Sequence, residues 1–148
     1  MIWKTDELPD IGALNAMSQN SMVSGLGIEV TGVGEDSISA RMPVDHRHVQ
    51  PMRLLHGGAS VVLAETLGSI AASLCVDSAE QTCLGLDINA NHLRSVREGG
   101  AVVATAVPIH LGGRTQVWEI RIADEADGRL VCVSRLTLAV VGRRRSAS

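Results

Sequence analysis

The chain has 148 residues, a formal net charge of −3, and 45% hydrophobic residues. This length suits one domain with a sizeable core. The acidic balance gives no electrostatic basis for a nucleic acid or an anionic membrane as the main partner. Phe and Tyr are absent and only two Trp residues occur, so the core must be aliphatic and base-stacking surfaces are disfavoured.

The first part of the chain predicts a short helix followed by two strands. Asp10 can cap a helix over residues 11–19, whose apolar residues recur on one face. Residues 28–33 and 38–44 alternate between apolar and polar positions, which indicates strands, and the four residues between them indicate a hairpin turn. A polar loop, residues 45–53, comes next.

The central stretch Leu54–Val76 is apolar or small at nearly every position, and Glu65 is its only formally charged side chain. Its length and its Ala and Leu content predict a buried helix. An apolar run of about 20 residues could also span a membrane, but the charge in its middle and the strand-like sequence on both sides favour a core helix. Glu65 is then either a structural carboxylate hydrogen-bonded in the core or a functional group.

The second half of the chain predicts four strands joined by turns. The expected strands span residues 83–93, 101–111, 115–123 and 129–141. By strict alternation, one face of the first of them carries Leu84, Leu86, Ile88, Ala90 and His92. Gly112-Gly113 indicates a tight turn, and short turns make the last strands an antiparallel meander. One antiparallel sheet with helices on one face is an α+β fold.

The chain ends and the cysteines give further expectations. We expect one domain over residues 1–141 and a disordered, solvated basic tail over residues 142–148. Cys75, Cys83 and Cys132 are widely spaced without a CxxC pair, which is typical of buried thiols. No signal peptide is recognisable at the start. Together these features predict a cytoplasmic protein.

The strongest candidate site combines Gln50, His56, Gly57, Glu65 and Ser69. The N–H of Gly57 at a helix start carries partial positive charge that favours an oxyanion, although paired glycines also suit a plain tight turn. Ser69 lies four residues after Glu65, so both share one helical face. Its hydroxyl can orient the carboxylate or a water, or it can simply pack and bond back to the main chain.

Distance along the helix separates the two central groups. Eight residues lie between Gly57 and Glu65, which is about 12 Å along a helix at ~1.5 Å per residue. One carbonyl group cannot touch both. If both serve one site, Glu65 must come from a second copy of the chain, which predicts an obligate dimer with two shared sites at its interface.

Other catalytic constellations are weaker. The five histidines form no HExxH motif or Cys/His cluster, so we expect no metal site. No GxSxG elbow and no activated cysteine is recognisable. Arg94, Arg97 and Arg114 follow strand ends and turns, where they are either ordinary solvated charges or phosphate contacts.

Several segments together resemble the hotdog-fold acyl-CoA thioesterases. They are LLHGGASVVLAE (54–65), INANHLRSVREG (88–99), HLGGRTQVWEI (110–120), and the short matches MIWK and MPVD near the start. The resemblance covers residues 1–141 and is strongest for the branch of 1,4-dihydroxy-2-naphthoyl-CoA hydrolases, enterobactin proofreading thioesterases and 4-hydroxybenzoyl-CoA thioesterases that use a glutamate. It implies an antiparallel sheet wrapped around a long central helix. Departures such as Asp87 and the arginine-rich tail lie outside the catalytic set.

The resemblance also implies roles for the candidate residues. Glu65 would be the catalytic carboxylate, acting as nucleophile or general base, and the Gly57 amide would be the oxyanion donor. Gln50 and His56 would polarise and hold the carbonyl, and Ser69 would place the attacking water. The residues expected to bind coenzyme A and the acyl group are Gly85, His92, Leu93, Arg94, Ser95, His110, Leu111, Gly112, Gly113, Arg114 and Thr115.

The implied function is hydrolysis of an aromatic acyl-CoA, either 1,4-dihydroxy-2-naphthoyl-CoA, an intermediate of menaquinone biosynthesis, or a related aryl thioester. No metal or organic cofactor is implied, since coenzyme A is part of the substrate. The family dimer is a continuous sheet, and dimers commonly pair into homotetramers. One alternative is a proofreading thioesterase that removes misloaded aryl groups from an acyl carrier protein. Another is a non-catalytic acyl-CoA sensor. A hydratase is a further option on this fold, but this sequence has no Asp-His pair in a recognisable hydratase motif.

Overall fold

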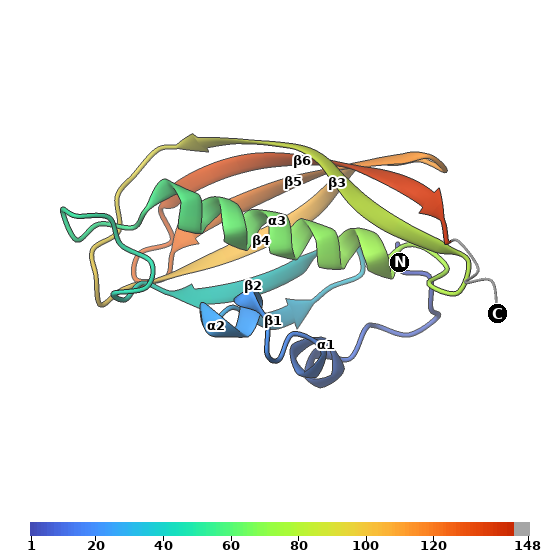
Figure 1. Ribbon diagram of the computed structural model, residues 1–148, viewed down its shortest axis with the longest axis horizontal. Helices are drawn as coiled ribbons and strands as arrows, with labels where there is room; N and C mark the ends of the chain where they lie inside the picture. Colours follow the sequence, from blue (N-terminus) through green and yellow to red (C-terminus); the bar gives the residue numbers. More distant parts are fainter. Residues whose placement is uncertain (144–148) are drawn as a thin grey trace.

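A six-stranded antiparallel sheet packs against one long helix in the computed structural model, which describes residues 1–143 (Figure 1). The strands, in their order across the sheet, are β1 (Glu29–Val33), β2 (Ile38–Pro43), β4 (Ala101–Leu111), β5 (Thr115–Asp124), β6 (Leu130–Gly142) and β3 (Gln81–His92). Helix α3 (Gly57–Leu74) crosses one face of the sheet. Two short helices, α1 (Ile11–Met17) and α2 (Met22–Gly25), lie near β1. The predicted α+β arrangement is confirmed.

The core lies between α3 and the sheet. Leu63 and Leu67 on the helix are fully buried, as is Trp118 on β5, and each buried leucine contributes about 2 kcal/mol through the removal of its surface from water. Gly68 allows close contact with β6, because a Cβ at this position would lie 2.7 Å from Cδ2 of Leu136. By length and composition alone α3 could cross a membrane, but it is the core helix of this domain.

The helix is buried on one side only. Of its 18 residues, 39% are buried, and the side that carries Glu65 and Ser69 is half-exposed in the single chain. The prediction of a helix buried all round therefore holds only for the sheet-facing side. The helix also begins three residues later than the predicted stretch, because Leu54 and Leu55 form isolated β-bridges with Arg97 and Val49 instead.

Strands β4, β5 and β6 form the predicted meander. Their first turn is closed by the N–H of Gly112, which donates to the carbonyl of Thr115 at 2.9 Å. Strand β3 does not join the meander next to β4; it pairs with β6 and forms the far edge of the sheet. The short α2 was not predicted, because its four residues are too few to show a helical period.

The predicted faces of β3 are wrong in its first half. The pairing with β6 shifts between Gly85 and Asp87, which is a β-bulge at Leu86. Gly85 pairs with buried Leu138, so it shares the helix-facing side with Ile88, whereas Leu84 faces outward and is 53% exposed. Strict alternation fails because the bulge adds one residue.

The predicted disordered tail falls mainly outside the described residues, because residues 144–148 are not among them. Strand β6 continues to Gly142, which pairs with Gln81 at the start of β3. The prediction for the rest of the tail stays a prediction.

Candidate active site

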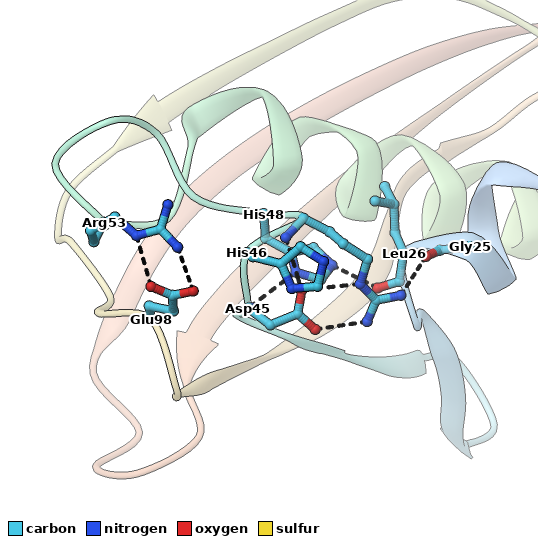
Figure 2. A network of polar contacts seen from close by, with 8 residues as sticks. Gly25, Leu26, Asp45, His46, His48, Arg53 and Glu98 are labelled. Atoms are coloured by element: carbon cyan, nitrogen blue, oxygen red, sulfur yellow. Dashed lines mark hydrogen bonds and ion pairs between the residues drawn. The ribbon is translucent and has the colours of Figure 1, made fainter.

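The loop before α3 is held by a buried histidine. The side chain of His48 is fully buried, and its Nε2 lies 2.7 Å from the carbonyl oxygen of Leu26 beside α2 (Figure 2). Its Nδ1 accepts a hydrogen bond from the backbone N–H of Asp45 at 3.1 Å. Since a carbonyl can only accept, the ring carries its proton on Nε2. His48 thereby ties the loop to the segment that follows α2.

Two ion pairs hold the same loop at its ends. The Arg47 guanidinium bonds both carboxylate oxygens of Asp45, at 3.0 and 2.8 Å, and also donates to the carbonyl of Gly25. Hydrogen bonding from Arg47 holds the pKa of the Asp45 carboxyl well below its usual range. Arg53 pairs with Glu98 through two hydrogen bonds of 2.8 and 2.6 Å (Figure 2). The loop that carries Gln50 is therefore braced on both sides.

The start of α3 leaves one amide free. His56 caps the helix, because its Nδ1 accepts the N–H of Gly58 at 2.8 Å, and its own N–H donates to the carbonyl of His48 at 2.8 Å. Within residues 1–143, the N–H of Gly57 has no hydrogen-bond acceptor. A free N–H at the positive end of an 18-residue helix suits an anion or a developing oxyanion.

A cavity of about 440 Å³ opens beside this amide. It is lined by Gln50, Leu54, Leu55, Gly57, Ser60, His92, Leu93, Arg94, Ser95 and Val131. The ring of His92 covers Gly57, where a Cβ would lie 2.9 Å from its Nε2. The cavity thus brings together the braced loop, the helix start and the end of β3, with Gln50 and the His92–Ser95 stretch as the sequence analysis expected.

Glu65 lies apart from this cavity, in the middle of α3. Its carboxylate faces β3 at Gly85, where a Cβ would lie 2.8 Å from Oε1. The side chain is half-buried, and no hydrogen bond or ion pair joins it to another residue within 1–143. A structural carboxylate hydrogen-bonded in the core would show such partners, so that alternative loses its support. Ser69 is half-buried one turn further along the helix.

The turn between β4 and β5 lies at the opposite end of the domain. Gln116, at the start of β5, donates from Nε2 to the carbonyl of Ala72 near the C-terminal end of α3 at 3.4 Å. The predicted binding residues of this turn, His110–Thr115, are therefore not brought to the Gly57 cavity within one chain. They are exposed apart from Gly112, which is half-buried.

The sequence did not predict a second cavity, nor four lining residues of the first, Leu54, Leu55, Ser60 and Val131. The second cavity, of about 410 Å³, shares Leu93, Arg94, Ser95 and Val131 with the first and adds Asp124, Asp127 and Arg129 from the β5–β6 turn. Ser60 is the polar residue among these four. Its spacing of three residues from Gly57 on one helical face was a usable signal.

The described residues give little basis for other chemistry. Among residues 1–143, no group of three or more His, Cys, Asp or Glu side chains is placed to hold a metal ion. Burial raises the pKa of the Cys75 thiol to about 11, with a smaller contribution from Cys83, and burial also raises the pKa of the Cys83 and Cys132 thiols. These thiols stay protonated near neutral pH and are poor nucleophiles.

Known proteins resemble the chain over nearly its whole length. Residues 52–131 match the Thioesterase superfamily. A 1,4-dihydroxy-2-naphthoyl-CoA hydrolase from Escherichia coli is 54% identical over 95% of this chain and 100% of that protein. A proofreading thioesterase from Cronobacter turicensis is 49% identical, covering 96% of this chain and all of its own length. A thioesterase structure from Haemophilus influenzae is 53% identical over 100% of both chains, with a TM-score of 0.92. The chain therefore belongs to the thioesterase superfamily, with the hotdog fold and the thioester hydrolase activity of that family.

Proposed function

We propose that this protein hydrolyses an aromatic acyl-CoA thioester with Glu65 as its catalytic carboxylate, and that 1,4-dihydroxy-2-naphthoyl-CoA is the leading candidate substrate. The observation that carries the proposal is the pair of unused groups on α3. The Gly57 amide has no acceptor, and the Glu65 carboxylate has no partner among residues 1–143. The E. coli relative supports the choice of substrate through its name.

A second copy of the chain would complete the site. Strand β3 is an edge strand, and it touches both groups: Gly85 lies against Glu65, and His92 lies over Gly57. If two β3 strands pair antiparallel around a two-fold axis at Asn89, and Leu86 bulges out of this pairing as it does opposite β6, Gly85 of one chain lies opposite His92 of the other. Paired strands are about 4.8 Å apart, so Glu65 of one chain would approach Gly57 of its partner. Two such dimers would form the expected homotetramer.

In this arrangement the Gly57 N–H would donate to the thioester carbonyl oxygen and stabilise the charge that develops on it. The Gln50 Oε1 already accepts the N–H of Met52, which leaves the Gln50 amide N–H groups as further donors on the cavity wall. His56 would act through its cap, which keeps the neighbouring Gly58 N–H occupied and that of Gly57 free.

The chemical step has two routes with the same products. In the first, a Glu65 oxygen bonds to the carbonyl carbon, the carbon–sulfur bond breaks, and coenzyme A leaves as thiolate; water then hydrolyses the mixed anhydride. In the second, Glu65 takes a proton from a water that attacks the carbonyl, and the thiolate leaves with that proton. Ser69 would place the water in either route. We propose that no metal or organic cofactor takes part, because Glu65 and the Gly57 amide supply the required groups.

Replacement of Glu65 by Gln tests the proposal most directly. Glu65→Gln keeps the shape of the side chain but removes the nucleophile and base, so we expect thiol release to fall by at least about 10³-fold. The assay measures thiol release from a panel of aryl and alkyl coenzyme A thioesters. Glu119→Gln is the matched control, because Glu119 is half-buried on β5 and pairs with Arg121 away from the cavity. Full turnover by Glu65→Gln would refute the assignment.

Removal of misloaded aryl groups from a carrier protein is the second candidate, favoured by the name of the C. turicensis relative. Rates on carrier-bound and on free coenzyme A thioesters separate the two functions. A non-catalytic sensor would bind acyl-CoA without releasing thiol, which conflicts with a thioesterase superfamily match. We place the reaction in the cytoplasm, since Cys75, Cys83 and Cys132 are all free thiols.

A further inference from the structure

Ser60 is a buried polar residue of the cavity that the proposed chemistry does not use. It lies one turn of α3 after Gly57, lines the cavity, and is 1% exposed. A serine inside a helix often bonds the carbonyl four residues back, as Ser73 does to Ser69 at 2.9 Å. The Ser60 hydroxyl has no such bond, nor any other, within residues 1–143. Since no fully buried side-chain polar atom in this range lacks a partner, the hydroxyl must open into the cavity.

The surroundings of Ser60 indicate which part of a substrate it meets. Leu54, Leu55 and Val131 give this cavity an apolar wall, while Arg94 and Ser95 connect it to the second, polar cavity beside Arg129. The cleft therefore has an apolar part at Ser60 and a polar part at the β5–β6 turn. An aryl thioester of coenzyme A has the same asymmetry, with an apolar ring on one side of the thioester and phosphates far away on the other.

Ser60 follows Gly57 by about one turn of α3, so the two groups can bind neighbouring oxygen atoms of one substrate. Residues three apart on a helix have Cβ atoms about 5–6 Å from each other. The amide would take the thioester carbonyl, and the hydroxyl would take a neighbouring polar atom of the acyl group. A ring hydroxyl close to the carbonyl satisfies this spacing and can both donate to and accept from Ser60.

We propose that Ser60 hydrogen-bonds a hydroxyl group on the aryl ring and makes the enzyme prefer hydroxylated aryl-CoA substrates over their plain analogues. This inference rests on the function proposed above and specifies its substrate class. A site built to bond a substrate hydroxyl discriminates against the analogue that lacks it, because the buried polar group of the site is then left unpaired.

A two-by-two comparison of enzyme and substrate tests this inference. Wild type and Ser60→Ala are each assayed for thiol release from 1-hydroxy-2-naphthoyl-CoA and from 2-naphthoyl-CoA. We expect Ser60→Ala to lower kcat/KM for the hydroxylated substrate by about 10-fold or more, and for the plain substrate by no more than about two-fold. Ser60→Ala should also unfold at no lower a temperature than wild type, because no hydrogen bond within the chain is lost.

Ser134→Ala is the matched control, since Ser134 on β6 is equally buried at 1% exposure but does not line either cavity. It should leave the ratio of the two kcat/KM values unchanged. An equal loss on both substrates by Ser60→Ala, or a loss accompanied by a lower unfolding temperature, would overturn the role of Ser60 while leaving the thioesterase proposal intact. Failure of wild type to release thiol from either substrate would instead defeat the proposed function itself.

Discussion

The two edges of the sheet differ in whether the rest of the chain covers them. At β1, the Asn15 side chain of α1 accepts from the N–H of Val30 at 2.8 Å and donates to its carbonyl at 3.0 Å. β1 is also short and irregular, with a register shift between Val30 and Gly32. At β3, twelve residues run along the edge with exposed Leu84 and Leu86. Proteins protect free edges from pairing, so one edge is closed by the chain itself and the other is available to a second chain.

The largest expected effect comes from adding charge to the open edge. Asn89 is exposed on β3 opposite Arg135 of β6, so Asn89→Asp should be tolerated within one chain. In the proposed dimer the new carboxylate and that of Asp87 would lie close to the same two carboxylates of the second chain, across the two-fold axis. Like charges on paired strands are destabilising, so we expect the dissociation constant of the dimer to rise by at least about 10-fold. Sedimentation measures this constant, and activity should be lost at low protein concentration.

The control for this change lies on the closed edge. Thr31 is exposed on β1, and Thr31→Asp should change neither the assembly nor the rate. A wild-type protein that is active as a strict monomer would contradict the assignment of the open edge, as would full activity of a monomeric Asn89→Asp variant.

A moderate effect is expected from opening the closed edge. Asn15→Ala removes both hydrogen bonds to Val30, which should lower the free energy of unfolding by about 1–2 kcal/mol without changing the rate of thiol release. Urea unfolding measures this. Asn15→Asp keeps the acceptor for the Val30 N–H but turns a second carboxylate oxygen toward the Val30 carbonyl, so it should not recover the stability of wild type. Equal stability of all three proteins would show that Asn15 does not protect this edge.

The smallest effect is expected from the ion pair of Asp45 and Arg47, which ties the active-site loop to Gly25 near the closed edge. Arg47 lowers the pKa of Asp45 in the folded state. A lowered carboxyl pKa gives stability that is present above the pKa of the unfolded chain, about 3.9, and is lost as the pH falls through the folded value. The unfolding temperature of wild type should therefore exceed that of Asp45→Asn at pH 7, with the gap closing as the pH falls below 4. A gap that is constant with pH would exclude the Asp45 charge as its source.

The sequence predicted the elements whose pattern is local and long. Helix α3 and strand β4 show in their own composition, and the separation of Gly57 from Glu65 follows from helix rise alone. The bulge at Leu86 escaped prediction, because alternation carries no mark of an inserted residue. The edge contacts of Asn15 and the open hydroxyl of Ser60 depend on segments distant in the chain, so only the folded structure reveals them.

The inserted residue in β3 has a consequence for the acid on α3. Without the bulge, Leu86 would pair with Leu138, and its side chain would occupy the place where Gly85 now meets Glu65. The Glu65 carboxylate would then face an apolar side chain, whereas it now faces the backbone of a glycine. The bulge thus leaves room for the Glu65 side chain beside an otherwise apolar surface.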